Sequence, residues 1–293
     1  MIFQQLFNGL LLGAVYALFA VGYTLVFGVL DILNLAHAAI FTAAAFAALS
    51  LAAHGMPLPL AFLLAATMAG IVGILLDRVA FAPLRRRNAG TLVPLISSIG
   101  VAIIILAILQ GIYGVDEQHF SNLGLDSAPA IHLGPVTFTI IEVTILVLAL
   151  VLMFVLSWML RSTALGRSIR AVASDRTAAA LLGVHLERTI AWTFFIASSL
   201  GGAAGVLFGL QYNSVTWDMG SPIELKGLAV IILGGMGSIT GAVVGGFIIG
   251  AVEVASTAVG LSEWRDAITF GVMFLILVVR PAGIFGRRTL RQA

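Results

Sequence analysis

The stretch LVPLISSIGVAIIILAILQGIY, residues 92–113, has no charged side chain and is long enough to cross a lipid bilayer as a helix. The whole chain has a similar character. Its 293 residues are 60% hydrophobic and 10% charged, whereas an average soluble domain has about 25% charged residues. A soluble fold of this length could not cover its surface with so few charges. The composition therefore excludes a cytosolic enzyme, a disordered chain and a nucleic-acid-binding protein.

Other apolar runs of similar length predict an all-α polytopic membrane protein with about eight hydrophobic regions. The runs are predicted to be helices, because open strands cannot satisfy their backbone groups in lipid. Besides residues 92–113, the runs are 6–30, 35–53, 60–82, 137–160, 189–212, a long broken region at 223–258 and a last run at 264–279. Residues 1–293 are therefore predicted to form a single transmembrane domain.

Basic residues cluster in three segments, which the positive-inside rule places in the cytoplasm. These segments are residues 78–87, residues 161–188 and the chain after residue 279. The segment 114–136 has three acidic residues and no Lys or Arg. It is therefore predicted to be an external loop, and the C-terminus is predicted to be cytoplasmic. The side of the N-terminus stays open, because no charged residue precedes Asp31.

The glycine-rich segment GGMGSITG, residues 234–241, interrupts the last long apolar region. The part before it, residues 223–233, is too short to span a bilayer at about 1.5 Å per residue. The chain is predicted to be external at 213–222 and cytoplasmic after 279, so an odd number of crossings must lie between. A re-entrant pair followed by one span is the simplest arrangement. The glycines could place half-helix ends at a substrate passage or could allow close helix packing.

Polar residues recur near the end of the first apolar run. Asp31, Asn34 and His37 have a spacing that places them on one broad face of a helix. Polar residues inside a membrane usually face the bundle interior or a pathway. One interpretation is a substrate passage; the other is a helix break, with Asp31 as a cap and with Asn34 and His37 bonded to neighbouring helices. The predicted passage residues are Tyr23, Asn34, His37, Gly234, Gly235 and Gly237.

Three ionisable residues lie in or beside the broken region. Glu224 and Lys226 could pair or could lie at the outer interface, whereas Glu253 has no partner close in the sequence. A structural pair or an interfacial position is favoured here over a proton relay.

The segment 161–188 is a long loop in which apolar and small residues recur at helical spacing from 169 to 180. Gly183 is placed to end a short amphipathic helix. Such a helix could lie on anionic lipid headgroups or could dock on a cytoplasmic partner. The length of the loop and its acidic residues favour the partner.

Several chemistries lack their motifs in this sequence. The chain has no Cys, and its single lysine, Lys226, is not part of a Gly-Lys-Ser/Thr phosphate loop. Its five His residues are scattered, without the spacing of a zinc site. A Gly-x-Ser-x-Gly nucleophile elbow is absent as well. The sequence therefore predicts no enzyme and no metal site.

The opening NGLLLGAVYAL at 8–18, with GYTLVFG at 22–28 and NLAH at 34–37, resembles the permease of branched-chain amino acid ABC importers of the Liv type. It is most similar to the H-type half of that permease pair, and the likeness includes RPAGIFG at 280–286. Permeases of urea and short-amide importers are similar, so the substrate stays open. An autonomous channel or ion-driven carrier is a second class of function, and Asp31 and Glu253 are its candidate ion-binding acids.

The resemblance implies a permease subunit in a bacterial inner membrane, surrounded by membrane lipid. It implies two ATP-binding subunits, a second permease subunit that makes a heterodimer, and an extracytoplasmic solute-binding protein. ATP and magnesium would be bound by the partner subunits, so this chain would hold no cofactor.

The resemblance also implies a role for the 161–188 loop. Importer permeases carry an E-A-A-x-x-x-G loop that docks on the ATPase, and TAAALLG at 177–183 is similar. Thr177 replaces the glutamate, which weakens the case for an ionic contact at this position. The predicted docking residues are Arg170, Asp175, Arg176, Ala179 and Gly183.

Overall fold

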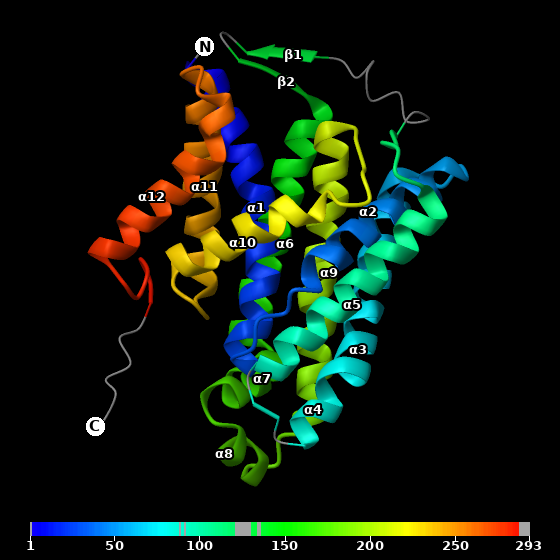
Figure 1. Cartoon of the computed structure of the whole chain (residues 1–293), viewed down its shortest axis with the longest axis vertical. Helices are drawn as coiled ribbons and strands as arrows, with labels where there is room; N and C mark the ends of the chain where they lie inside the picture. Colours follow the sequence, from blue (N-terminus) through cyan, green and yellow to red (C-terminus); the bar gives the residue numbers. More distant parts are fainter. Residues whose placement is uncertain (1, 88, 91, 121–129, 134–135, 287–293) are drawn as a thin grey trace.

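The computed structural model is an almost entirely helical bundle, described for residues 2–87, 89–90, 92–120, 130–133 and 136–286 (Figure 1). Six helices in the described part are long and apolar enough to cross a membrane. They are α1 (Ile2–Leu30), the continuous helix Leu58–Arg86, α5 (Leu92–Tyr113), α6 (Ile140–Ser162), α9 (Leu186–Tyr212) and α11 (Ile239–Ala258). Leu58–Arg86 consists of α3 (Leu58–Leu76), a π-helical turn at Asp77–Phe81 and α4 (Ala82–Arg86). The predicted all-α polytopic membrane fold is confirmed.

Three apolar helices are shorter than the six long ones. α2 (His37–Ala53) has 17 residues, and α10 (Gly220–Gly234) and α12 (Arg265–Val279) have 15 each. A helix needs about 20 residues to span the hydrocarbon core. The last run, predicted to be a span, forms a helix below this length, whereas α2, which begins only at His37 because a turn precedes it, has about the minimum length of a span, roughly 17 residues. In Figure 1, α10 lies strongly inclined to α1.

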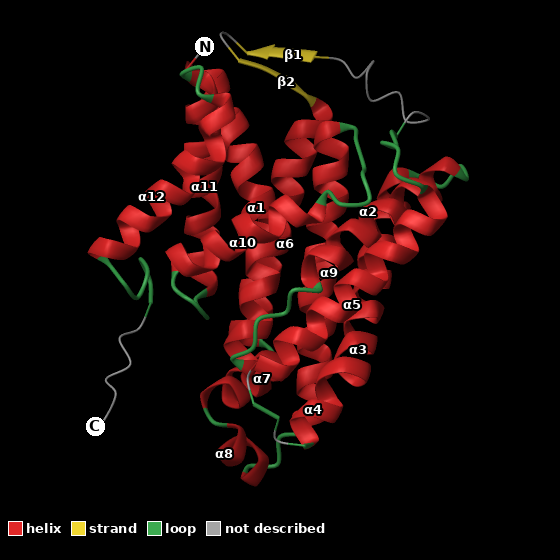
Figure 2. Cartoon of the chain, viewed as in Figure 1, coloured by secondary structure: helices red, strands yellow, loops and turns green. Residues whose placement is uncertain are grey.

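A small β-hairpin lies at one end of the bundle, where the predicted external loop 114–136 meets the run 137–160; residues 137–139 of that run form a strand and not the predicted helix. Strands β1 (Ala130–Leu133) and β2 (Val136–Thr139) pair antiparallel, and Figure 2 shows them beside the start of α1. The Gln4 side chain donates to the carbonyl of Thr137 at 2.9 Å and accepts from its N–H at 2.8 Å. The N-terminus therefore lies at the end of the bundle that the charge pattern predicts to be external, called the outer end below. Residues 121–129 and 134–135 of the predicted loop lie outside the described residues.

Helix α1 and helix α11 pack antiparallel at very close range. A Cβ atom placed on Gly246 would lie 2.5 Å from the backbone of Ala17, and one on Gly250 would lie 2.4 Å from the backbone of Gly13. Only glycine permits this approach without displacing the partner helix. The glycines after the 234–241 break therefore serve close packing.

The chain between α1 and α2 is not helical. α1 ends at Leu30, and Asp31 takes the left-handed conformation with a φ of 54°. The Asn34 side chain then accepts a hydrogen bond from the Ala36 N–H at 3.2 Å. The expectation that Asp31, Asn34 and His37 share one helix face is therefore wrong. A helix break is the structure of this segment, because a left-handed residue ends an α-helix.

The second predicted break is present at 234–241. α10 ends at Gly234, and both Gly235 and Gly237 take positive φ values, of 100° and 82°. The Ser238 side chain accepts from the Gly241 N–H at 3.1 Å and so begins α11. Because α11 alone is long enough to cross, the predicted re-entrant pair is one short helix and one full-length helix.

Candidate functional site

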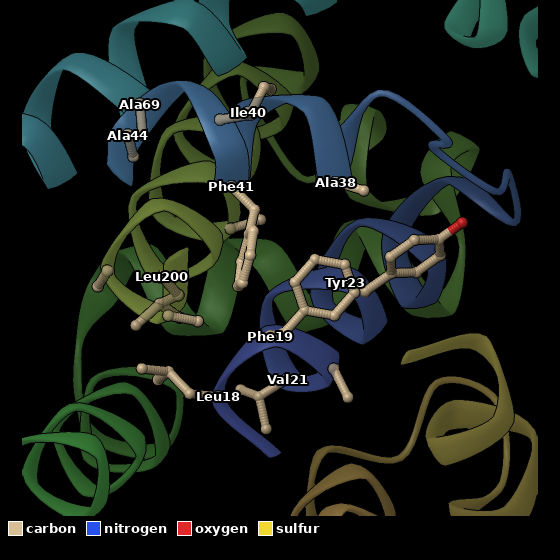
Figure 3. Close-up of a cluster of buried hydrophobic side chains, with 14 of the residues drawn as sticks. Leu18, Phe19, Val21, Tyr23, Ala38, Ile40, Phe41, Ala44, Ala69 and Leu200 are labelled. Atoms are coloured by element: carbon tan, nitrogen blue, oxygen red, sulfur yellow. The ribbon is translucent and has the colours of Figure 1, made fainter. Parts of the chain in front are cut away.

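Four rings from α1 and α2 pack together at the centre of the bundle. The ring centroids of Phe19 and His37 are 4.8 Å apart, and those of Tyr23 and His37 are 5.5 Å apart in an edge-to-face arrangement. Phe41 meets Phe19 edge-on at 5.5 Å. Figure 3 shows Phe19 and Phe41 pointing toward one another, with the Tyr23 ring beside Phe19. The rings fill the space between the helices, and Phe19, His37 and Phe41 are fully buried.

His37 occupies a space that two glycines leave open. A Cβ atom on Gly201 of α9 would lie 2.5 Å from the imidazole, and one on Gly22 of α1 would lie 3.2 Å from it. The two helices therefore close around the ring only because both positions lack a side chain.

The polar atoms of this cluster lack partners of good geometry within the described chain. These atoms are the Tyr23 hydroxyl and both His37 ring nitrogens, although the Phe19 backbone interacts with the imidazole electrostatically; the Asn34 amide nitrogen, in the turn before α2, also has no partner in the described chain. Nearly all buried polar groups in proteins have a hydrogen-bond partner. Unsatisfied groups inside a membrane bundle are therefore candidates for contact with a substrate or water.

A cavity of about 390 Å³ lies between this cluster and the end of the bundle opposite the hairpin. It brings together the end of α1, the end of α6, helix α7 and the 234–241 break. Its lining residues are Thr24, Leu25, Gly28, Val29, Ser157, Leu160, Arg161, Ile169, Arg170, Ala173, Gly237, Ile239 and Thr240. The structure thus places Gly237, a predicted passage residue, and Arg170, a predicted docking residue, on one cavity.

The other two glycines of the predicted passage make backbone contacts instead. A Cβ on Gly234 would lie 2.2 Å from the carbonyl of Gly241, and one on Gly235 would lie 2.4 Å from the backbone of Gly286. Because they lack side chains, these glycines let the turn pack closely on the start of α11 and on the segment that follows α12.

The loop 161–188 forms two short helices at the end opposite the hairpin, α7 (Ala164–Ser174) and α8 (Arg176–Leu181). The predicted single helix is thus divided at Asp175, which ends α7 and caps α8 by accepting from the Ala178 N–H at 2.9 Å. Gly183 has a φ of 85°, the left-handed conformation expected after a helix end. The Asp175 division was not predicted, because a capping residue inside a helical pattern resembles a surface position.

One hydrogen bond joins this loop to the end of α1. The Arg176 guanidinium donates to the carbonyl of Val29 at 3.0 Å, two residues before the break at Asp31. The bond therefore ties α8 to the last turn of α1.

The predicted docking residues differ in exposure. Arg170, Asp175 and Gly183 are exposed and Arg176 is half-buried, whereas Ala179 is buried. Leu181 and Leu182 are 85% and 83% exposed at the tip of the loop. These two leucines lie within the TAAALLG stretch but were not among the predicted docking residues.

The sequence matches the protein family described as branched-chain amino acid transport system, permease component, over residues 5–277. The chain belongs to this permease family. One similar protein is the high-affinity branched-chain amino acid transport system permease protein LivH of Salmonella typhimurium, which is 33% identical over 97% of this chain and 95% of its own length. Another is the permease protein BraD of Pseudomonas aeruginosa, which is 35% identical over 97% of this chain and 95% of its own length. The autoinducer 2 import system permease protein LsrC of Klebsiella pneumoniae is 32% identical over 50% of this chain and 42% of its own length. No solved structure gives a significant match.

The permease contains a buried ion pair that sequence reasoning did not assemble. Lys226 of α10 and Glu253 of α11 are 4% and 5% exposed, and their Nζ and Oε1 atoms are 2.6 Å apart. The Tyr16 hydroxyl of α1 donates to the other Glu253 oxygen at 2.9 Å. Lys226 therefore pairs with Glu253 and not with Glu224. The sequence signal that could have predicted this pair is that Lys226 and Glu253 are charged residues of opposite sign in neighbouring apolar segments.

Proposed function

We propose that this permease is the membrane-spanning subunit of an ABC importer for branched-chain amino acids. The family and the full-length similarity to LivH and BraD support a permease role. Separate subunits bind ATP and magnesium and hydrolyse the ATP, so this chain holds no cofactor. The assembly contains two such subunits, a second permease that makes a heterodimer, and an extracytoplasmic solute-binding protein. The chain lies in a bacterial inner membrane with its C-terminus in the cytoplasm.

The single observation that carries the coupling mechanism is the Arg176–Val29 hydrogen bond. It connects the 161–188 loop, which we propose meets the ATP-binding subunits, to α1. The end of α1 lines the cavity of about 390 Å³ described above, which is called the inner cavity below. Nucleotide can change the helix arrangement only by favouring one arrangement over another. We propose that nucleotide-dependent movement of α7 and α8 shifts the last turn of α1 and so opens or closes the inner cavity.

Purification and uptake test the function directly. The permease should co-purify with an ATP-binding subunit, and vesicles that contain the whole complex should take up labelled leucine only with ATP. Competition among leucine, alanine, glutamate and urea then separates a branched-chain importer from the alternative urea or short-amide importer. Solute accumulation by the isolated chain without nucleotide would establish an autonomous ion-driven carrier instead.

Replacement of Arg176 by Gln should uncouple ATP hydrolysis from transport. Although the sequence placed Arg176 among the predicted docking residues, the complex should still form, because Arg176 is half-buried and its guanidinium bonds to Val29. A hydrogen bond from a charged donor contributes about 1.5–3 kcal/mol, so we expect the amount of leucine transported per ATP to fall about tenfold. R167Q, at an exposed position of α7, is the matched control. An unchanged transport-to-ATP ratio in R176Q would exclude this contact from coupling.

The Tyr23→Phe variant tests the predicted passage. It removes a buried hydroxyl without a partner and leaves the aromatic packing in place. We expect the thermal unfolding temperature to stay the same or rise, because an unsatisfied buried group is lost, while leucine uptake falls several-fold. Y113F, at the partly exposed end of α5, serves as the control. Wild-type uptake by Y23F would remove this hydroxyl from the passage.

A further inference from the structure

A second cavity, of about 350 Å³, lies toward the outer end of the bundle. It is formed by α1, the end of α9, the start of α10, α11 and the start of α12, together with residues of the outer loops. Its lining residues are Tyr16, Glu117, Phe208, Tyr212, Ser214, Thr216, Met219, Pro222, Ile223, Lys226, Glu253 and Arg265. Its volume falls in the range of small-molecule binding sites, about 300–1,000 Å³.

The charges of this outer cavity break the pattern of the rest of the chain. All basic residues except Lys226 and Arg265 lie in the three segments that the positive-inside rule places in the cytoplasm. These two exceptions line the same cavity. Charged groups at membrane depth are costly, and they mark substrate pathways when they are retained.

The charged residues that line the cavity are two basic ones, Lys226 and Arg265, and two acidic ones, Glu117 and Glu253. Glu253 Oε1 lies 2.6 Å from Lys226 Nζ and 3.8 Å from Arg265 Nε. Asp266 lies 3.3 Å from Lys226. The side chains of Arg265 and Asp266 are 51% and 55% exposed, and of these two only Arg265 lines the cavity beside the buried pair.

Apolar side chains complete the wall. Phe208 and Tyr212 of α9 and Met219 and Ile223 at the start of α10 face the same cavity. A charged cluster of both signs beside an apolar wall matches the chemistry of an α-amino acid with a hydrocarbon side chain. Urea and short amides carry no charges that need such a cluster.

We propose that this outer cavity receives the substrate as a zwitterionic amino acid. Arg265 holds the α-carboxylate, Glu253 on the cavity wall holds the α-ammonium group, and the Phe208 wall takes the apolar side chain. A neutral zwitterion enters without changing the net charge of the cluster. The proposal rests on the proposed function, because it assigns a substrate class to the same transport pathway.

The position of the cavity along α1 fits a site that receives substrate first. Tyr16 lines the outer cavity and Thr24 lines the inner one, and eight residues of helix separate them by ~12 Å. Phe19 and Tyr23 lie between on the same stripe of α1, inside the closed aromatic cluster. The structure therefore holds the two cavities apart by a packed barrier.

The test uses the complete complex in nanodiscs, without the solute-binding protein, and measures saturable binding of labelled L-leucine. Wild type should bind leucine, and both leucinol, which lacks the carboxylate, and 4-methylpentanoate, which lacks the ammonium group, should compete at least about tenfold more weakly. R265Q should raise the half-saturating leucine concentration about tenfold, as expected for a lost charged hydrogen bond. R265K should recover part of the affinity. E263Q, on the neighbouring exposed turn and outside the cavity lining, should match wild type.

A transport assay in vesicles with the solute-binding protein supplies the second readout. R265Q should lower the leucine transported per ATP while the ATPase stimulation by the loaded binding protein stays at the wild-type value. Equal leucine affinity in R265Q and wild type, or equal competition by leucinol, would overturn the cavity assignment alone. Failure of the wild-type complex to transport leucine with ATP would overturn the proposed function, and the assignment with it.

Discussion

Replacement of Leu181 and Leu182 together by Asp should abolish association with the ATP-binding subunits while the permease stays inserted in the membrane. Both leucines are more than four-fifths exposed, at the tip of a loop rich in arginine. Burial of a leucine side chain at an interface contributes about 1.5–3 kcal/mol. Loss of both therefore predicts association weaker by roughly two to four orders of magnitude. Co-purification in detergent, followed by titration of the isolated ATP-binding subunit, measures the effect.

The matched control for this variant lies at the opposite end of the molecule. Val259 and Leu261 follow α11 at the outer end and are 77% and 44% exposed. The double variant V259D/L261D introduces the same two charges but should bind the ATP-binding subunits as wild type does. Wild-type association of L181D/L182D, or equal loss in the control, would contradict docking through the loop tip. Ala179 is a poorer test site, because it is buried and its replacement disturbs packing first.

How well each element of the fold could be predicted depends on which feature of its sequence is tied to a physical requirement. Apolar length predicted the six long helices, because a bilayer demands it of any span. The glycine stretch 234–241 predicted the second break, because its composition disfavours a helix interior. The break at Asp31 was ambiguous, because the same spacing of polar residues fits a helix face and a capped turn. Nothing in that spacing encodes the left-handed conformation of Asp31.

The candidate site was harder to predict, because its groups meet only in three dimensions. Lys226 and Glu253 are 27 positions apart, on helices joined through the glycine turn. Tyr16, which bonds to Glu253, lies on a third helix near the start of the chain. Their proximity depends on the glycine contacts between α1 and α11, which set how closely the helices approach and in which register. A single sequence shows the charges but not this register.

Replacement of Lys226 by Met should destabilise the permease more than any surface substitution. Glu253 would remain 5% exposed without the ammonium group 2.6 Å away. Removal of one partner from a buried ion pair costs about 3–5 kcal/mol, because the other charge is left without compensation. Thermal unfolding of the purified chain, followed by the loss of monodisperse protein on gel filtration, measures the effect. R87M, at an exposed position beyond α4, should change stability by less than about 0.5 kcal/mol.

The double variant K226M/E253Q separates an ion-pair effect from a packing effect. If the uncompensated carboxylate causes the loss, removal of both charges should restore most of the stability, because replacement of a whole buried pair is often nearly neutral. Tyr16 can still donate its hydrogen bond to the side-chain amide oxygen that E253Q introduces, so the third helix keeps its contact. If instead the methionine simply packs badly, the double variant should be no more stable than K226M. Stability of K226M equal to that of wild type would mean that Arg265, 3.8 Å from Glu253, already suffices as its counter-ion.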